Sequence, residues 1–369
     1  MASSFFSPKT QFENVGDALI NREMIKLATK HSDVYVDASR CPENFCSTLN
    51  LKNSKEINVI NGGTLKLFLM ILKMVLSGEQ CYYYLSPGGY FGEISGKEHL
   101  NKYINFFILI FFYLLGVKIC HVGVSYERLE KNFVRLIRLR SKILHSHVLR
   151  DKKSAKYSDS LNIRYTSVAP DLAYNIFHDE KKTEKTEKTE KTEKTEKTES
   201  ICFSFRTDQD PRQLEIVKKL ILIIDELTPN NLKYYFYSQV VRDNESMKSL
   251  YEFSKKNINR DVEYIEIIGD IDVSLGFFSN VSRIVSNRLH VLLMSGSVGC
   301  KLAPSFLDGY NDKILGLFES LDGFTCPAID MAELSKNKIE SIIVDKSDII
   351  KLGLLQKNRL KATYEDIYS

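Results

Sequence analysis

The sequence predicts an α/β protein with two doubly wound domains that face each other across a cleft. Three observations predict this fold class. The chain has 369 residues, enough for two or three domains at about 150 residues each. Short β-rich runs alternate with longer helical patterns in both halves, as in parallel sheets with crossover helices. A Lys-Thr-Glu repeat without apolar residues divides the chain near its middle.

The first half contains six runs rich in β-branched and aromatic residues. They predict strands at residues 34–37, 57–60, 81–85, 117–122, 143–148 and 163–168. A helix is expected over residues 19–30, because apolar residues recur there at helical spacing (Ile20, Met24, Leu27 and Ala28). This alternation predicts a parallel sheet in the first half.

The second half repeats the alternation. Strands are expected at residues 201–205, 233–237, 263–268, 283–286 and 301–303, and a helix over residues 211–227. The repeat tract carries balanced charge and nothing that could be buried, so we expect a disordered linker over residues 181–200. Two Rossmann-like domains, 1–180 and 201–369, are therefore predicted, with the last helices packing back on the first domain.

The composition excludes several classes of protein. Hydrophobic residues make up 43% and charged residues 27%, which excludes wholesale disorder. The formal net charge is only +4, so we expect no nucleic-acid partner. The seven cysteines form no CxxC pair and no cluster with zinc-ligand spacing, so we expect no metal and reduced thiols. The N-terminus is too short and polar for a signal peptide, and a cytoplasmic protein is predicted.

The most apolar stretch lies at residues 106–117. A helix of that size covers about 20 Å, short of the ~30 Å hydrocarbon core of a bilayer. A buried core helix is the first interpretation. The alternative is a helix that enters the membrane interface, at the inner face of the cell membrane, because a basic amphipathic helix follows between Arg128 and Lys142.

Ligands of doubly wound sheets bind beyond the carboxyl ends of the strands, so the residues that follow strands are the candidates for chemistry. In the first half, Gly16 allows close approach of backbone to a ligand, and Asp17 is expected to cap the helix that follows. An ordinary capped turn is the alternative. Gly88 and Gly89 open a glycine-rich loop that ends at Glu93.

In the second half, Arg206 follows the first predicted strand, and Arg288 and His290 follow a later one. A guanidinium at such a position can hold a phosphate or carboxylate through two parallel hydrogen bonds. An imidazole two residues after an arginine is a candidate for proton transfer beside a bound anion. A surface ion pair and a structural histidine are the alternatives.

Taken in order, these segments resemble the polysaccharide pyruvyl transferase family. No single segment is specific for the family, but the order of the segments is. The resemblance covers roughly residues 10 to 330. The matching segments are Asn14-Val-Gly-Asp-Ala-Leu-Ile20, Pro87-Gly-Gly-Tyr-Phe-Gly-Glu93, Leu115-Gly-Val-Lys-Ile-Cys-His-Val-Gly-Val-Ser125, Leu149-Arg-Asp-Lys-Lys-Ser154, Ala169-Pro-Asp-Leu-Ala173, Phe203-Ser-Phe-Arg206, and Ser286-Asn-Arg-Leu-His290 with Tyr310-Asn-Asp-Lys313 behind it.

The resemblance implies a glycosyltransferase-like fold of the GT-B type. It implies a transferase that moves the enolpyruvyl unit of phosphoenolpyruvate onto a glycan or lipid-linked sugar as a ketal, with release of phosphate. No cofactor or metal is implied. The acceptor would be a precursor of a surface polysaccharide such as capsule, exopolysaccharide or lipopolysaccharide.

Residue roles follow from the same resemblance. Arg206 and Arg288, with Leu289 beside them, would bind the donor. His290 would be the general acid that protonates the methylene carbon, and Glu93 would be the base toward the sugar hydroxyl. The acceptor side would include five residues: Asn14, Gly16, Asp17, Gly88 and Gly89.

Two other functions stay open at this point. A glycosyltransferase could use a sugar nucleotide on the same scaffold. A non-catalytic protein at the membrane surface would also explain the apolar stretch and the basic helix. The sequence carries no signal for the oligomeric state.

Overall fold

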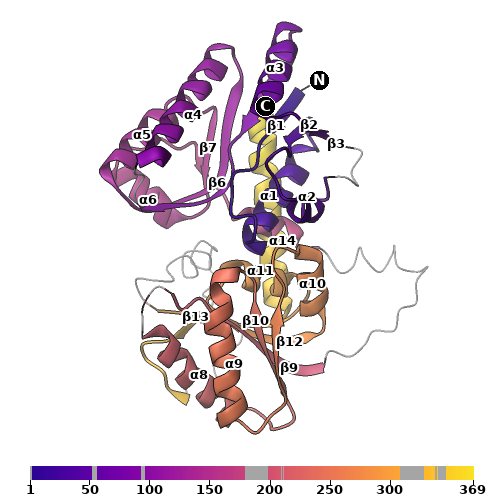
Figure 1. Cartoon of the computed structure of the whole chain (residues 1–369), viewed down its shortest axis with the longest axis vertical. Coiled ribbons are helices and arrows are strands. Elements are labelled where there is room, and N and C mark those ends of the chain that lie inside the picture. Colours follow the sequence, from indigo (N-terminus) through magenta and orange to yellow (C-terminus); the bar gives the residue numbers. More distant parts are fainter. Residues whose placement is uncertain are drawn as a thin grey trace, which may run out of the picture. The chain divides into compact units, whose positions relative to one another are not determined.

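The computed structural model describes residues 2–51, 56–92, 96–178, 198–208, 210, 212–307, 328–336, 339 and 346–369 (Figure 1). Most of the repeat tract lies outside these ranges. The chain divides into two compact units. Unit 1 comprises Met1–Phe12, Asp17–Leu172 and Asn358–Ser369, and unit 2 comprises Glu13–Gly16 and Ala173–Lys357. The last twelve residues thus group with the first unit, as the final part of a long helix.

Unit 1 contains an eight-stranded parallel sheet. Its order is β3-β2-β1-β4-β6-β7-β8, and β5 pairs with β6. The strands are β1 (Ala2–Phe6), β2 (Asp33–Asp37), β3 (Ile57–Ile60), β4 (Gln80–Tyr84), β5 (Gly88–Gly92), β6 (Lys118–Leu129), β7 (Ser146–Leu149) and β8 (Ser167–Val168). The helices are α1 (Val15–Ala28), α2 (Glu43–Thr48), α3 (Gly63–Leu76), α4 (Gly96–Leu114), α5 (Lys131–Ser141) and α6 (Lys152–Ser160), with a short 3₁₀ helix, η1 (Leu172–Ile176), after β8.

Two layers of helices cover the sheet of unit 1. Leu67 of α3 and Phe112 of α4 pack on one face, against Phe5 and Ile119. On the other face, the end of α14 (Lys346–Tyr368) reaches the sheet through Tyr368, whose hydroxyl lies 2.6 Å from Ser4 Oγ and 3.1 Å from Tyr84 Oη. The end of the C-terminal helix is therefore part of the core of unit 1.

The central strand β1 was not predicted. Its segment reads as polar because Ser3 and Ser4 occupy two of its five positions. Both serines are buried, and each finds a partner far away in the sequence: Ser3 Oγ donates to Glu79, and Ser4 Oγ lies 2.6 Å from Ser32 Oγ. A buried hydroxyl with a hydrogen-bond partner costs little, so polar residues can occupy the middle of a sheet.

Unit 2 contains a six-stranded parallel sheet of order β11-β10-β9-β12-β13-β14. The strands are β9 (Thr198–Ser204), β10 (Lys233–Ser238), β11 (Val262–Glu266), β12 (Val281–Ser286), β13 (Lys301–Phe306) and β14 (Ile329–Asp330). The helices are α8 (Gln213–Leu227), α9 (Asn244–Asn257), α10 (Ile271–Ser279) and α11 (Leu289–Ser297), with a short 3₁₀ helix, η2 (Val241–Asp243), before α9.

This strand order is that of a doubly wound fold. Counted from β9, it reads third, second, first, fourth, fifth, sixth. In such sheets the order reverses between the first and fourth strands, and ligands bind beyond the carboxyl ends at that point. In unit 2 the reversal lies between β9 and β12; in unit 1 it lies between β1 and β4. The predicted α/β class with two parallel, doubly wound sheets is confirmed.

The glycine-rich segment that begins at Gly88 was predicted as a loop, but Gly88–Gly92 forms β5, which pairs in parallel with β6. The linker predicted over residues 181–200 overlaps β9, which begins at Thr198.

Two expectations about helices also need correction. Residues 106–117 are not a fully buried helix: Leu109 and Phe112 of α4 are buried, but Phe107 and Leu114 are 65% and 75% exposed. Asp17 does not cap α1, because Asn14 does so. The side chain of Asn14 accepts a hydrogen bond from the backbone N of Gly16 at 3.0 Å.

Candidate functional site

The candidate site lies where β9 and β12 end. The two strands pair in parallel, and Ser204 lies opposite Ser286. Arg206 and Arg288 each follow these serines by two residues, so they leave the sheet at equivalent positions on neighbouring strands. Because the strand order reverses here, two guanidinium groups reach the place where doubly wound sheets bind ligands.

Hydrogen bonds fix the backbone of both arginines. Ser286 Oγ donates to the carbonyl of Ser204 at 2.6 Å and accepts from the backbone N of Arg288 at 2.9 Å. The side chain of Asn287 accepts from the N of Arg206 at 2.7 Å and donates to its carbonyl at 2.9 Å. The ends of the two strands are thereby tied together, so the guanidinium groups start from fixed positions.

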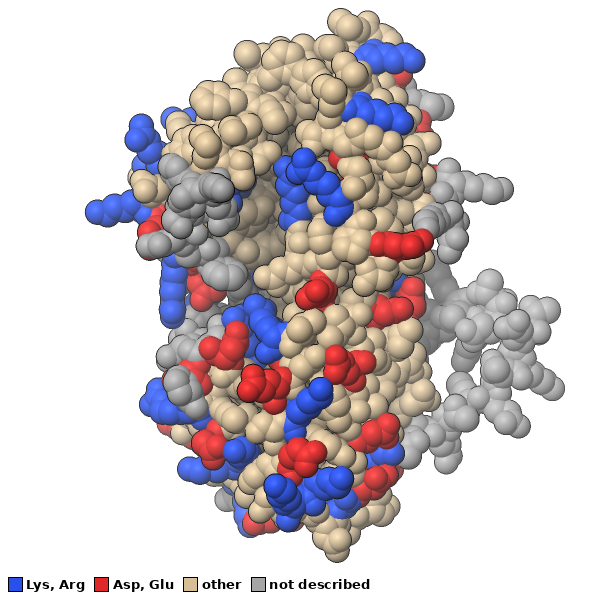
Figure 2. All heavy atoms as spheres, in the orientation of Figure 1, with Lys and Arg blue, Asp and Glu red and all other residues tan. Residues whose placement is uncertain are grey.

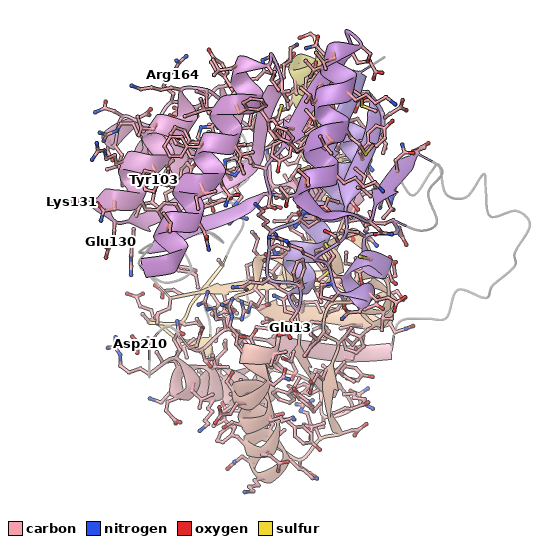
Figure 3. All side chains as sticks on the ribbon, turned by 45° about the horizontal axis from the view of Figure 1, so that its top comes forward. Glu13, Tyr103, Glu130, Lys131, Arg164 and Asp210 are labelled. Atoms are coloured by element: carbon pink, nitrogen blue, oxygen red, sulfur yellow. The ribbon has the colours of Figure 1, made fainter. Side chains whose placement is uncertain are left out.

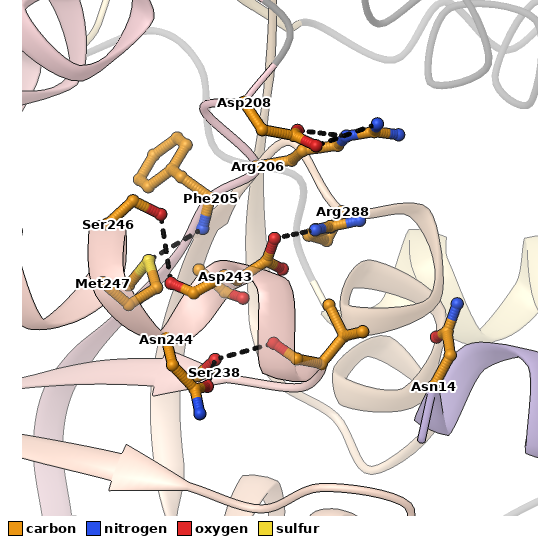
Figure 4. Close-up of polar contacts among 12 residues, drawn as sticks. Asn14, Phe205, Arg206, Asp208, Ser238, Asp243, Asn244, Ser246, Met247 and Arg288 are labelled. Atoms are coloured by element: carbon orange, nitrogen blue, oxygen red, sulfur yellow. Dashed lines mark hydrogen bonds and ion pairs between the residues drawn. The ribbon is translucent and has the colours of Figure 1, made fainter. Parts of the chain in front are cut away.

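Arg206 is the more accessible arginine. Its Nη2 donates to Asp208 at 3.2 Å, and its Nε donates to the other carboxylate oxygen, so the pair is bidentate (Figure 4). Burial alone would raise the pKa of Asp208, but the hydrogen bonds from Arg206 and the surrounding arginine charges lower it. The carboxylate of Asp208 thus occupies the edge of Arg206 that a substrate anion would need.

Arg288 is buried, and its Nη2 forms an ion pair with Asp243, at the end of η2 (Figure 4). Burial lowers the pKa of Arg288 to about 10, against the raising effect of Asp243, so the guanidinium stays charged at neutral pH. Burial also raises the pKa of Asp243. Within the described residues, Arg288 Nε and Asp243 Oδ2 have no hydrogen-bond partner.

The cluster attracts anions. The charges of Arg206 and Arg242 both act on Arg288, which shows that three guanidinium groups share this region with the carboxylates of Asp208 and Asp243. The cations outnumber the carboxylates. In addition, α11 begins at Leu289, directly after Arg288, and a helix N-terminus favours negative charge.

His290 lies in the first turn of α11, against the start of α1. A Cβ added to Gly16 would overlap the His290 ring, at Nδ1. The turn of Asn14 and Gly16 therefore packs on the imidazole, and both segments belong to unit 2 (Figure 4 shows Asn14). His290 and Leu289 are half-buried.

The profile of the polysaccharide pyruvyl transferase family matches residues 14–303. The match covers most of the chain, from the Asn14 turn past the Arg288 and His290 segment. The chain belongs to the polysaccharide pyruvyl transferase family. It is accordingly a transferase, as the resemblance implied. No curated protein matches it.

Solved structures of other proteins resemble this pyruvyl transferase family member in fold. A glycosyltransferase from Rickettsia africae ESF-5 aligns with a TM-score of 0.55 at 8% identity, over 99% of this chain and 98% of its own. The UDP-GlcNAc 2-epimerase from Methanocaldococcus jannaschii aligns with a TM-score of 0.52 at 13% identity, over 96% of this chain and 93% of its own. At these identities the likeness shows the fold alone, which confirms the predicted GT-B-like class.

The predicted site residues of the transferase are divided between the two units of the chain. Arg206, Arg288, Leu289, His290 and the Asn14–Gly16 turn all lie in unit 2. Three other candidates, Asp17, Gly88 and Gly89, belong to unit 1. The carboxylate of Asp17 accepts hydrogen bonds from Thr10 Oγ1 at 2.8 Å and from the N of Gln11 at 3.3 Å. Glu93 lies outside the described residues.

Sequence reasoning missed the polar partners of the arginines. Asn287 lies inside the Ser286–His290 segment, but an asparagine in a sequence does not indicate which groups it will bind. Asp243 follows the end of β10 by five residues, so the rule of strand ends would have pointed to it. Among the described residues, no group of three or more His, Cys, Asp or Glu side chains is placed to hold a metal ion.

Proposed function

We propose that this family member transfers the enolpyruvyl unit of phosphoenolpyruvate to two hydroxyls of a sugar, giving a pyruvate ketal and phosphate. The observation that carries the proposal is the pair of arginines at paired positions beyond β9 and β12. Phosphoenolpyruvate has a phosphate and a carboxylate on one carbon. Two guanidinium groups that approach from neighbouring strands suit two anionic groups held so close together.

The reaction balances in atoms and protons. A proton adds to the methylene carbon, which becomes the methyl group, and the adjacent carbon becomes oxocarbenium-like. One sugar hydroxyl adds to that carbon, and the bond to phosphate oxygen breaks. A second hydroxyl completes the ketal. The sugar hydroxyls lose two protons, while the methyl group and the phosphate gain one each.

His290 is the proposed general acid. It is placed two residues after Arg288, in the first turn of α11, so a donor held by the arginines would lie near its ring. General acid catalysis of this kind contributes on the order of 10²–10⁴ in rate.

The remaining roles are proposed on the resemblance alone. Glu93 would accept the proton of the attacking hydroxyl, and Asn14, Gly16, Asp17, Gly88 and Gly89 would face the acceptor. Leu289 would shield the donor. The acceptor class is a glycan or lipid-linked sugar of a surface polysaccharide. We place this reaction at the cytoplasmic face of the membrane, where such lipid-linked precursors are presented, and propose no cofactor.

A second candidate is a glycosyltransferase that uses a sugar nucleotide. The likeness in fold to the Rickettsia structure supports this candidate, because that protein is described as a glycosyltransferase. A diphosphate would also suit the arginine cluster and the start of α11. The two candidates differ in which donor the cluster recognises.

A thermal-shift experiment on the full chain separates them. A ligand that binds only the folded state raises the melting temperature by mass action. We expect phosphoenolpyruvate to raise it, and UDP or UDP-GlcNAc to leave it unchanged. The Arg206→Met and Arg288→Met proteins should lose the shift, whereas Arg283→Met, on β12 but not at its carboxyl end, should keep it. A shift by the nucleotides alone would reject the pyruvyl donor.

Turnover is tested by phosphate release from phosphoenolpyruvate with lipid-linked oligosaccharide extracts as acceptor. Release is expected only when the acceptor is present. A His290→Gln protein that retains full release would remove the proton-transfer role from this residue while leaving the donor assignment intact.

A further inference from the structure

Two neighbouring helices of unit 1 expose an unusual amount of apolar surface. Most large hydrophobic side chains that are exposed among the described residues lie on α3 and α4, and not scattered over the molecule. They are Leu65, Leu69, Leu76, Leu100, Ile104, Phe107, Phe111, Tyr113 and Leu114. Single exposed hydrophobic residues need no explanation, but a contiguous patch marks an interaction site.

The exposed residues form one stripe on each helix. On α3, Leu65, Leu69 and Leu76 recur at spacings of four and seven residues, and on α4, Phe107 and Phe111 continue the same helical spacing. The opposite sides of both helices are buried in the core of unit 1. The solvent-facing sides are therefore apolar in addition to the core-facing sides.

The two stripes form one surface. The ring of Phe68 on α3 lies 5.3 Å from the ring of Phe111 and 5.8 Å from that of Phe112 on α4. We call the exposed side chains of the two stripes the apolar face. Figure 2 shows that this part of unit 1 is mostly free of charged side chains, in contrast to the densely charged surface of unit 2.

Basic residues border the apolar face. Together α3, α4 and α5 carry eight Lys or Arg residues and one Glu. Lys66 and Lys73 are exposed beside the stripe on α3. Helix α5 lies next to α4, because Lys102 Nζ sits 4.2 Å from the centre of the Phe133 ring. On α5, Lys131 projects outward (Figure 3), and Arg135 is exposed.

This combination points to one occupant. A second copy of the chain would bring two basic borders together in a symmetric contact, and like charges would oppose it. A bilayer with anionic headgroups accepts both features, because apolar side chains enter the headgroup boundary and the lysines and arginines meet lipid phosphates. No described helix is long and apolar enough to span a membrane, so the contact would be peripheral.

We propose that the apolar face docks unit 1 on an anionic lipid surface. The aliphatic and aromatic side chains of α3 and α4 supply insertion, and the basic residues of α3 and α5 supply electrostatic attraction. Stable peripheral binding requires two such contributions together, apolar insertion and electrostatic attraction. The proposal does not depend on the identity of the donor.

The test is co-sedimentation of the full chain with vesicles of phosphatidylcholine, with and without phosphatidylglycerol. Binding is expected only with phosphatidylglycerol, and it should weaken as salt is added, since salt screens charges beyond about 10 Å at 0.1 M. Leu69→Glu and Phe107→Glu should each reduce binding about tenfold or more, because a carboxylate replaces an inserted side chain. Lys66→Glu combined with Lys73→Glu should do the same.

Matched controls separate docking from general effects of charge. Leu355 on α14 is 47% exposed, close to the 54% of Leu69, and Leu355→Glu should bind as the unaltered protein does. Lys219→Glu combined with Lys256→Glu reverses two exposed lysines of unit 2 and should also have no effect. Unchanged melting temperatures of the variants would show that they fold.

Three results would overturn the proposal. The first is equal binding to neutral and anionic vesicles, the second is equal loss in the unit 2 controls, and the third is a dimer in light scattering that Leu69→Glu converts to a monomer. The last result would assign the apolar face to a second copy of the chain.

Discussion

The guanidinium of Arg288 forms a buried ion pair with the carboxylate of Asp243, and each side chain keeps one polar atom without a partner in the described part of the chain. The side chains are only 9% and 3% exposed. Because a buried charge without its counter-ion is costly, the pair fixes the position of Arg288 before any ligand arrives.

Removal of the carboxylate of Asp243 tests this positioning. In Asp243→Asn the hydrogen bond can persist, but the charge of Arg288 loses its counter-ion, and we expect the free energy of unfolding to fall by about 1–3 kcal/mol. Urea titration measures it. Asp208→Asn, which alters a more exposed ion pair, should cost less than about 1 kcal/mol. Equal losses in both proteins would argue against a special role of the buried pair.

Asp208 is expected to compete with the donor for Arg206. The carboxylate occupies both Nε and Nη2 of that guanidinium, so a donor anion has to displace it. Asp208→Asn removes this competitor, and phosphoenolpyruvate should bind about three- to tenfold more tightly, which corresponds to about 1 kcal/mol. Isothermal titration of donor into each protein measures the change. Weaker binding would show instead that Asp208 orients Arg206.

The two buried histidines of unit 1 predict a loss of stability in acid. Burial, with the charge of Arg140, lowers the pKa of His147 to about 4 from 6.5, and the same two causes lower the pKa of His121 well below its usual value. A lowered pKa means that the neutral ring stabilises the fold above pH 6.5 and that this contribution disappears as the pH falls through about 4. For His147 it amounts to about 3 kcal/mol.

Ring resonances in NMR spectra can follow this titration directly. His147 should remain neutral to about pH 4, held by Tyr126 Oη at 2.8 Å from Nε2. Protonation of the His147 ring near its ordinary pKa of 6.5 would contradict its buried, neutral state.

Local sequence patterns predicted most of the strands. They failed where a strand depends on hydrogen bonds to residues far away in the sequence. The strands at residues 57–60 and 233–237 were predicted closely because β-branched and aromatic residues mark them. Strand β1 was missed because the partners of Ser3 and Ser4 lie at Glu79 and Ser32. A single sequence does not show which remote group will satisfy a buried hydroxyl.

The candidate site likewise has residues that the local pattern predicts and contacts that it does not predict. Arg206 and Arg288 follow recognisable strands, and the parallel register of β9 and β12 then puts them side by side. The pairing of Arg288 with Asp243 depends on the path of η2, which no periodicity indicates. The exposure of α4 was also unpredictable, because an apolar run reads the same whether a sheet covers one side or both.

Gly16 provides the most selective test of the His290 environment. Alanine suits the backbone of α1, but its Cβ would overlap the imidazole, so Gly16→Ala should displace the ring. We expect kcat/KM for phosphoenolpyruvate to fall by about 10–100-fold, less than the roughly 10²–10⁴ expected for complete loss of a general acid, because the ring is moved and not removed. Gly276→Ala is the matched control: nothing lies within 4 Å of its Cβ, and α10 should gain up to about 1 kcal/mol with activity unchanged. Donor binding measured by thermal shift should survive in both proteins. Full activity of Gly16→Ala would mean that the reaction does not use His290 where it lies.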